Sequence, residues 1–188
     1  MVKHLIPLVA VMASIAVVAI AFTFLTGHTV AAQSSPELAQ FTALSHATSD
    51  QCAYLGDKAA IYSSVDSEMN NTYYQGSCCS PMDYNHYAQQ IAGLKNYSSI
   101  SAVPQNPYNV SVGQIKQMLG YYDSIVLNQS QNATFNQAAS LTQDKSWCCC
   151  QCWAWYAHAG LAKYMIKNYN YNVSQVVTLI NLEDCCGG

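Results

Sequence analysis

The sequence predicts a mainly α-helical protein, a disulfide-stapled bundle of about five helices that follows an N-terminal hydrophobic leader. Three observations support this fold class. An uncharged apolar run opens the chain, nine cysteines gather at a few places, and the rest of the sequence carries helix-start signals without continuous strand alternation.

The leader is predicted over residues 1–32. Lys3 and His4 precede an uncharged run over 5–26, and Val30-Ala31-Ala32 supplies the small residues of a cleavage site. The run is longer than the ~7–15-residue core of a signal peptide and reaches the ~20 residues that span a bilayer. A cleaved signal peptide and an uncleaved membrane anchor therefore both stay open, and both place residues 33–188 outside the cell as a single domain.

Nine cysteines in a small exported domain predict a disulfide framework, because export exposes them to an oxidising compartment. Their pairing is left open by the sequence. The disulfide candidates are Cys52, Cys78, Cys79, Cys148, Cys149, Cys150, Cys152, Cys185 and Cys186. Six acceptor sequons also agree with an exported, glycosylated surface, at Asn70, Asn96, Asn109, Asn128, Asn132 and Asn172.

Local signals place the helix starts. Ser35-Pro36 and Ser80-Pro81 each set a Ser N-cap before a Pro at the first helical position. Ser111 followed by Gln114 is a capping-box pattern, and Ser174 is expected to open a last helix. The intervening loops are expected around 63–78, 97–108 and 127–147.

The stretch from Cys152 to Ile166 is expected to form the core helix. Only His158 and Lys163 are strongly polar in it, so a helix here is apolar on nearly every side. Trp153 and Trp155 should supply much of the buried surface.

A weak internal repeat relates residues 78–127 to residues 149–188. Each copy contains a double cysteine, a helix and a Ser-capped second helix, which would give two repeated helical hairpins. Coincidence is the alternative, because Tyr and Asn are abundant in this chain.

The charge inventory argues against nucleic-acid binding. The chain has ten acidic side chains, seven lysines and no arginine, so it lacks the bidentate phosphate fork and carries a net negative charge. The expected partners are a target-cell envelope or another surface protein, and a membrane if residues 5–26 stay attached.

The segment Cys149-x-x-Cys152-Trp153-Ala154-Trp155 resembles the nucleophile half of the papain-like cysteine peptidases, and the likeness extends over residues 149–188. It implies that Cys152 is the nucleophile and Cys149 a structural half-cystine. Two departures weaken this implication. The position of the family's oxyanion-hole Gln is occupied by Ser146, and the His/Asn half of the family is absent. We therefore predict that the protein is not an enzyme and has no catalytic residue.

Metal binding is the second chemical alternative. The spacing of Cys149 and Cys152 is that of a zinc half-site, but the second matching C-x-x-C is absent. His86 is interpreted as a helix-face histidine. The sequence therefore favours disulfides and predicts no metal ligand and no cofactor.

Three function classes follow. The preferred one is an exported, non-catalytic, disulfide-rich helical protein that acts outside the cell as a secreted or membrane-associated antimicrobial or toxin-type protein. In size, leader, sequons and cysteine density the chain resembles secreted archaeal antimicrobials of the sulfolobicin kind. The alternatives are a structural or adhesive cell-surface glycoprotein and a degenerate or truncated papain-like peptidase.

Overall fold

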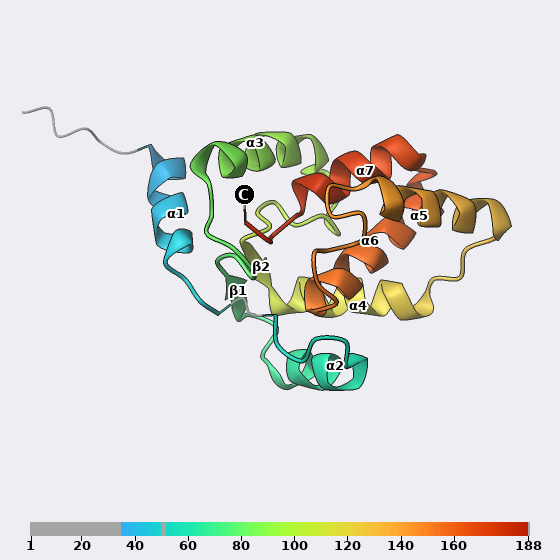
Figure 1. Cartoon of the computed structure of the whole chain (residues 1–188), viewed down its shortest axis with the longest axis horizontal. Helices are drawn as coiled ribbons and strands as arrows, with labels where there is room; N and C mark the ends of the chain where they lie inside the picture. The colour runs from blue at the N-terminus through green and yellow to red at the C-terminus, as the bar shows by residue number, and fades with distance from the viewer. Residues whose placement is uncertain (1–34, 50–51, 188) are drawn as a thin grey trace, which may run out of the picture. The chain divides into compact units, whose positions relative to one another are not determined.

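The computed structural model describes residues 35–49 and 52–187 of the chain, and this part is mainly helical (Figure 1). The leader predicted over 1–32 lies outside the described residues. In the described part, no helix has both the length and the apolar character needed to cross a membrane.

Seven α-helices, one short 3₁₀ helix and a two-stranded sheet make up the described chain. In order they are α1 (Pro36–Ser45), α2 (Lys58–Ser67), β1 (Tyr73–Gln75), α3 (Tyr84–Leu94), η1 (Lys95–Tyr97), β2 (Asn109–Ser111), α4 (Val112–Ser124), α5 (Gln129–Leu141), α6 (Trp153–Tyr169) and α7 (Val173–Leu182). The strands pair antiparallel, with Tyr74 opposite Val110.

Two of the predicted helix starts are confirmed. The Ser35 hydroxyl accepts a hydrogen bond from the N–H of Leu38 at 3.1 Å and Pro36 begins α1, while the Ser111 hydroxyl accepts from the N–H of Gln114 at 3.2 Å and caps α4. In both, the serine oxygen satisfies one of the N–H groups that the first helical turn leaves unpaired.

The other two predicted starts are wrong by a few residues. Asp83 caps α3, because the hydroxyl of Ser80 donates instead to the carbonyl oxygen of Cys186 at 2.7 Å. Asn172 caps α7 in a reciprocal capping box with Gln175. An Asn or Asp acceptor placed just ahead of the helix thus takes the role that was expected of a serine.

The prediction of about five helices is also too low. The region 127–147, expected to be a loop, contains the 13-residue helix α5. This helix has a complete capping box between Asn128 and Gln131, but only Ala138 on it is buried. A helix that buries one residue leaves almost no apolar periodicity in the sequence.

Helix α6 is the core element, as predicted. Eleven of its residues are buried, and it packs against α4 more extensively than any other two elements pack in the described part. Trp153 is buried and Trp155 is half-buried. The two helices approach closely at Gly160, where an added Cβ would lie 1.9 Å from the carbonyl oxygen of Met118.

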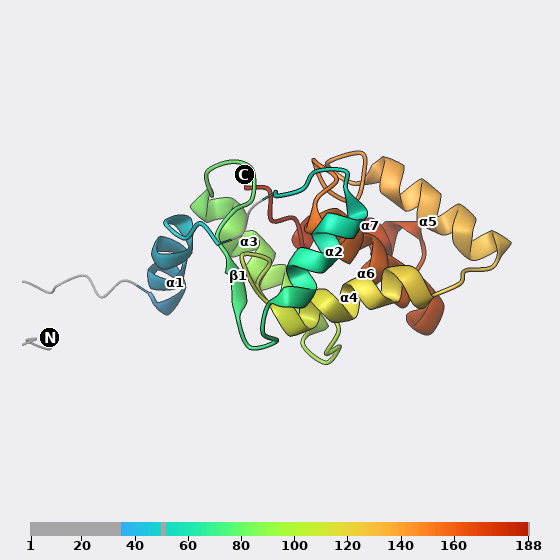
Figure 2. The same cartoon turned by 90° about the horizontal axis from the view of Figure 1, so that it is seen from below.

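The other helices surround this pair. Helix α7 packs against α5, α3 and α6, while α2 lies against α4 and α6 and α1 contacts α3 (Figure 2). The helices of the two predicted repeat copies therefore interleave, with α3 beside α7 and α4 beside α6. The repeat itself stays a prediction.

Candidate functional site, a nine-cysteine cluster

The nine cysteines lie together in one sulfur cluster, although they come from four separate segments. Their side chains are linked by Sγ–Sγ contacts of 2.8 to 3.8 Å and by further thiol interactions of Cys78 with Cys152 and Cys185. Cys52 precedes α2, Cys78 and Cys79 follow β1, Cys148, Cys149, Cys150 and Cys152 precede α6, and Cys185 and Cys186 follow α7.

Backbone hydrogen bonds hold these segments together. The N–H of Cys78 donates to the carbonyl oxygen of Cys185 at 3.1 Å, and the N–H of Ser80 donates to that of Cys186 at 2.9 Å. Gly187 has a φ of +95°, and an added Cβ there would lie 2.4 Å from the carbonyl oxygen of Ser80. Only glycine fits this close passage of the two segments.

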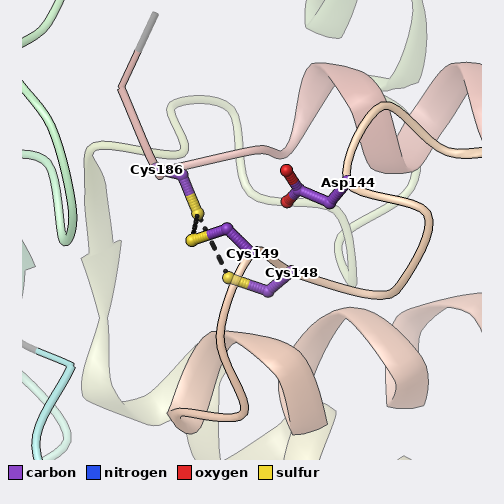
Figure 3. Close-up of side chains that lie close together, drawn as sticks. All are labelled: Asp144, Cys148, Cys149 and Cys186. Carbon is purple, nitrogen blue, oxygen red and sulfur yellow. Dashed lines mark hydrogen bonds between the residues drawn. The ribbon is translucent and has the colours of Figure 1, made fainter.

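One part of the cluster centres on Cys186. Its Sγ lies 2.8 Å from that of Cys149 and 3.2 Å from that of Cys148, and the carboxylate of Asp144 faces the same three sulfurs (Figure 3). Cys149 is exposed, whereas Cys148 and Cys186 are buried. This part is therefore reachable from solvent on one side.

A second part joins Cys52, Cys79 and Cys150. The Sγ of Cys52 lies 3.1 Å from that of Cys150 and 3.3 Å from that of Cys79. The Sγ of Cys79 also lies 3.1 Å from that of Cys149, so the two parts are continuous. All nine cysteines are thiols in the structure.

Burial and mutual hydrogen bonds shift the thiol pKa values in opposite directions. Hydrogen bonds with Cys148 and Cys152 raise the pKa of Cys78, while hydrogen bonds from Cys148 and Cys78 lower the pKa of Cys186. Burial, together with the charge of Cys186, raises the pKa of Asp184 to about 8. Neighbouring thiols therefore favour the thiolate form of Cys186 and the thiol form of Cys78.

A thiolate beside a thiol supports two chemistries. One is disulfide formation, in which the thiolate attacks an oxidised carrier and a neighbouring thiolate then displaces that carrier. The other is coordination of a thiophilic metal ion. The Sγ–Sγ distances in the cluster are compatible with disulfide formation and with metal coordination after a shift of the sulfurs.

The residues best arranged for a metal are Asp144, Cys148, Cys149 and Cys186, whose ligand atoms all lie within 4.8 Å of one another. Three sulfurs and one carboxylate oxygen form a four-ligand set of the kind that zinc accepts. Asp144 was not among the residues that the sequence singles out. The only signal in the sequence is an acidic residue four positions before Cys148. It does not indicate a ligand by itself, because only the fold brings Cys186 close to these two residues.

The proposed peptidase nucleophile, Cys152, is buried at the start of α6. Hydrogen bonds from Cys148 and Cys78, with further ones from the backbone N–H groups of the first turn, lower its pKa. The hydroxyl of Ser146 accepts from Nε1 of Trp155 at 2.9 Å. His158 uses Nδ1 on the carbonyl oxygen of Trp147 at 2.8 Å rather than on a thiol. Neighbouring thiols thus favour the thiolate form of Cys152, while Ser146 and His158 hydrogen-bond to groups other than its sulfur.

The sequons differ in their surroundings. Asn109 is half-buried in β2, where its Oδ1 accepts from Nε2 of Gln75 at 2.9 Å. The other five are exposed, and they are Asn70, Asn96, Asn128, Asn132 and Asn172. Their glycosylation stays a prediction.

No family model, no curated protein and no solved structure matches the chain.

Proposed function

We propose that this chain is an exported, non-catalytic helical protein that acts outside the cell, as a secreted or membrane-associated antimicrobial or toxin-type protein. The convergence of nine cysteine sulfurs from four chain segments carries the proposal. In an oxidising compartment such a cluster becomes a set of disulfides, and disulfides stabilise small exported domains against unfolding.

Three bridges can form together from the observed contacts. They are Cys52–Cys150 at 3.1 Å, Cys79–Cys149 at 3.1 Å and Cys148–Cys186 at 3.2 Å between sulfurs. They share no residue and connect all four segments. When a bridge forms, its two thiols release two protons and pass two electrons to an oxidised dithiol carrier. The two sulfurs must also approach each other to about 2.05 Å.

Action on other cells is tested with the purified, unreduced protein. We expect it to inhibit the growth of related cells on a lawn, and we expect inhibition to vanish after reduction and alkylation of the cysteines. The same protein, alkylated without reduction, is the control, because alkylation then leaves the disulfides intact. An unreduced protein that leaves every related strain growing normally would contradict the proposal.

A structural or adhesive surface glycoprotein is the first alternative. The exposed sequons outside the cluster favour it, because glycans there would leave the helical core undisturbed. Protein that remains on the producing cell and inhibits no neighbour would support this alternative.

A papain-like peptidase is the second alternative, and Cys152→Ser tests it. Cys152 is buried at the start of α6 and takes part in none of the three bridges above, so we expect Cys152→Ser to lower the free energy of unfolding by roughly 1–3 kcal/mol, because a hydroxyl group is costlier to bury than a thiol. Peptide hydrolysis and thermal unfolding are measured on the same sample. Hydrolysis by the wild type that disappears in Cys152→Ser at an unchanged melting temperature would make the protein an enzyme.

A further inference from the structure

A polar cavity lies between α3 and α7, two helices that meet near their ends in Figure 1. Its volume is about 380 Å³, near the lower end of the ~300–1,000 Å³ typical of ligand pockets. His86 and Gln90 line it from α3, Thr178 and Asn181 from α7, and Gln143 from the loop that leads to the cysteines.

Two of the residues that line this cavity each carry a buried polar atom that has no hydrogen-bond partner in the described structure. Gln90 is 2% exposed, and its Nε2 donates to the carbonyl oxygen of Asp184 at 2.7 Å. This bond fixes the orientation of the amide, because a carbonyl oxygen can only accept. Oε1 of Gln90 is left unpaired, as is Nε2 of His86 one helical turn earlier. Such atoms are costly to bury unless something pairs with them.

The opposite wall is held in place. Oδ1 of Asn181 accepts from the N–H of Gln143 at 2.9 Å, so the loop is tied to α7. Near the other end, Gly93 permits the close approach of α3 to α7, since an added Cβ would lie 2.6 Å from Leu182. The cavity is thus a preformed space between fixed elements.

The lining chemistry selects the ligand. Carboxamides and a hydroxyl group offer donors and acceptors side by side, and His86 is the only ionisable group among the lining residues. A charged ligand would be desolvated without a counter-charge, and an apolar ligand would leave Gln90 and His86 unpaired. A ligand with several adjacent hydroxyl groups satisfies both requirements.

We propose that this cavity binds a neutral sugar residue. The sugar would belong to a glycan on the cell that the protein acts on, so the cavity would bind the protein to the envelope of that cell. This part of the inference rests on the proposed function. Sugar binding itself depends only on the cavity.

The test is calorimetric titration of the intact, unreduced protein with glucose, galactose, mannose and N-acetylglucosamine, with glucuronic acid as the charged comparison. We expect at least one neutral sugar to bind and glucuronic acid to bind at least tenfold more weakly. Thr178→Tyr, an exposed position on α7, should fill the cavity and weaken binding at least tenfold. Gln117→Tyr, exposed on α4 away from the cavity, is the matched control and should bind as the wild type does.

Gln90→Met removes the unpaired acceptor and keeps the side-chain length. Because Gln90 also donates a hydrogen bond to the carbonyl oxygen of Asp184, the melting temperature of Gln90→Met is measured together with its affinity. If Gln90→Met does not fold, Thr178→Tyr at its exposed position still tests the inference. The inference is overturned if no neutral sugar in the panel binds, or if Thr178→Tyr and Gln117→Tyr bind equally. Growth inhibition without sugar binding would reject this inference alone, whereas sugar binding without inhibition would reject the proposed function alone.

Discussion

Among the single residues, three carboxyl groups near the cluster are held in surroundings that disfavour their charged form. Glu183 is fully buried, its Oε1 has no hydrogen-bond partner, and burial raises its pKa well above the ordinary value. Burial also raises the pKa of Asp144 and, to about 8, that of Asp184. Folding therefore shifts the protonation equilibrium of all three groups toward the protonated form.

The sign of the pH dependence follows. A carboxyl group whose pKa is raised by folding contributes stability that is fully present below its unfolded pKa, about 4, and is lost as the pH rises through its folded pKa. We expect the melting temperature to fall between pH 4 and pH 8.

Glu183→Gln should flatten this fall, because the amide releases no proton. Calorimetric melting of wild type and variant at pH 4, 6 and 8 checks it. Glu68→Gln, at an exposed position, should keep the wild-type slope. Identical slopes for all three proteins would show that Glu183 is not protonated in the folded state.

Among the elements, helices α4 and α6 pack closely because residue 160 is a glycine, which has no side chain. Gly160 lies where the backbone of α4 comes closest, and its Cβ would overlap the carbonyl oxygen of Met118. Backbone cannot move aside as a flexible side chain can, so an added methyl group must separate the two helices.

We therefore expect Gly160→Ala to lower the free energy of unfolding by roughly 1–3 kcal/mol or more. Gly120→Ala is the matched control on α4, where an added Cβ would meet nothing within 4 Å. It should raise the free energy of unfolding by about 0.5–1 kcal/mol, since alanine is the better helix former. Urea unfolding of both variants gives the comparison, and a neutral Gly160→Ala would mean that the helices are further apart than described.

Helices α6 and α5 differ in how well the sequence predicts them. Helix α6 was predictable because burial on nearly all sides leaves a long apolar run, whereas α5 was not, because it buries only Ala138. The cysteines could be named as a group from their number and compartment. Asp144 and the cavity around Gln90 could not, since each depends on chain segments that meet only after folding.

At the scale of the whole molecule, the cluster connects the segment before α2, the turn after β1, the start of α6 and the segment after α7. Cross-links among these positions would close loops that span most of the described chain. Such loops restrict the unfolded state strongly in the chain-entropy account of disulfides.

We expect at least three disulfides in the protein as exported. Alkylation without reductant, read by mass spectrometry, should label three thiols or fewer, and peptide mapping should link Cys52 to Cys150 and Cys79 to Cys149. The fully reduced protein is the control and should take up nine labels. Seven or more labels on the unreduced protein would reject the disulfide framework and favour a metal–thiolate centre.

The spread of the cluster along the sequence also bears on how the chain would mature during the export that we propose. Cys78 and Cys186 are 108 positions apart, so in an exported chain the early cysteines would leave the translocation channel well before their late neighbours. Until Cys185 and Cys186 emerge, seven thiols are available to one another without the segment that arranges them. Early oxidation then favours mispaired forms, so a cell that secretes this protein needs slow oxidation or an isomerase that reopens wrong bridges after translocation ends.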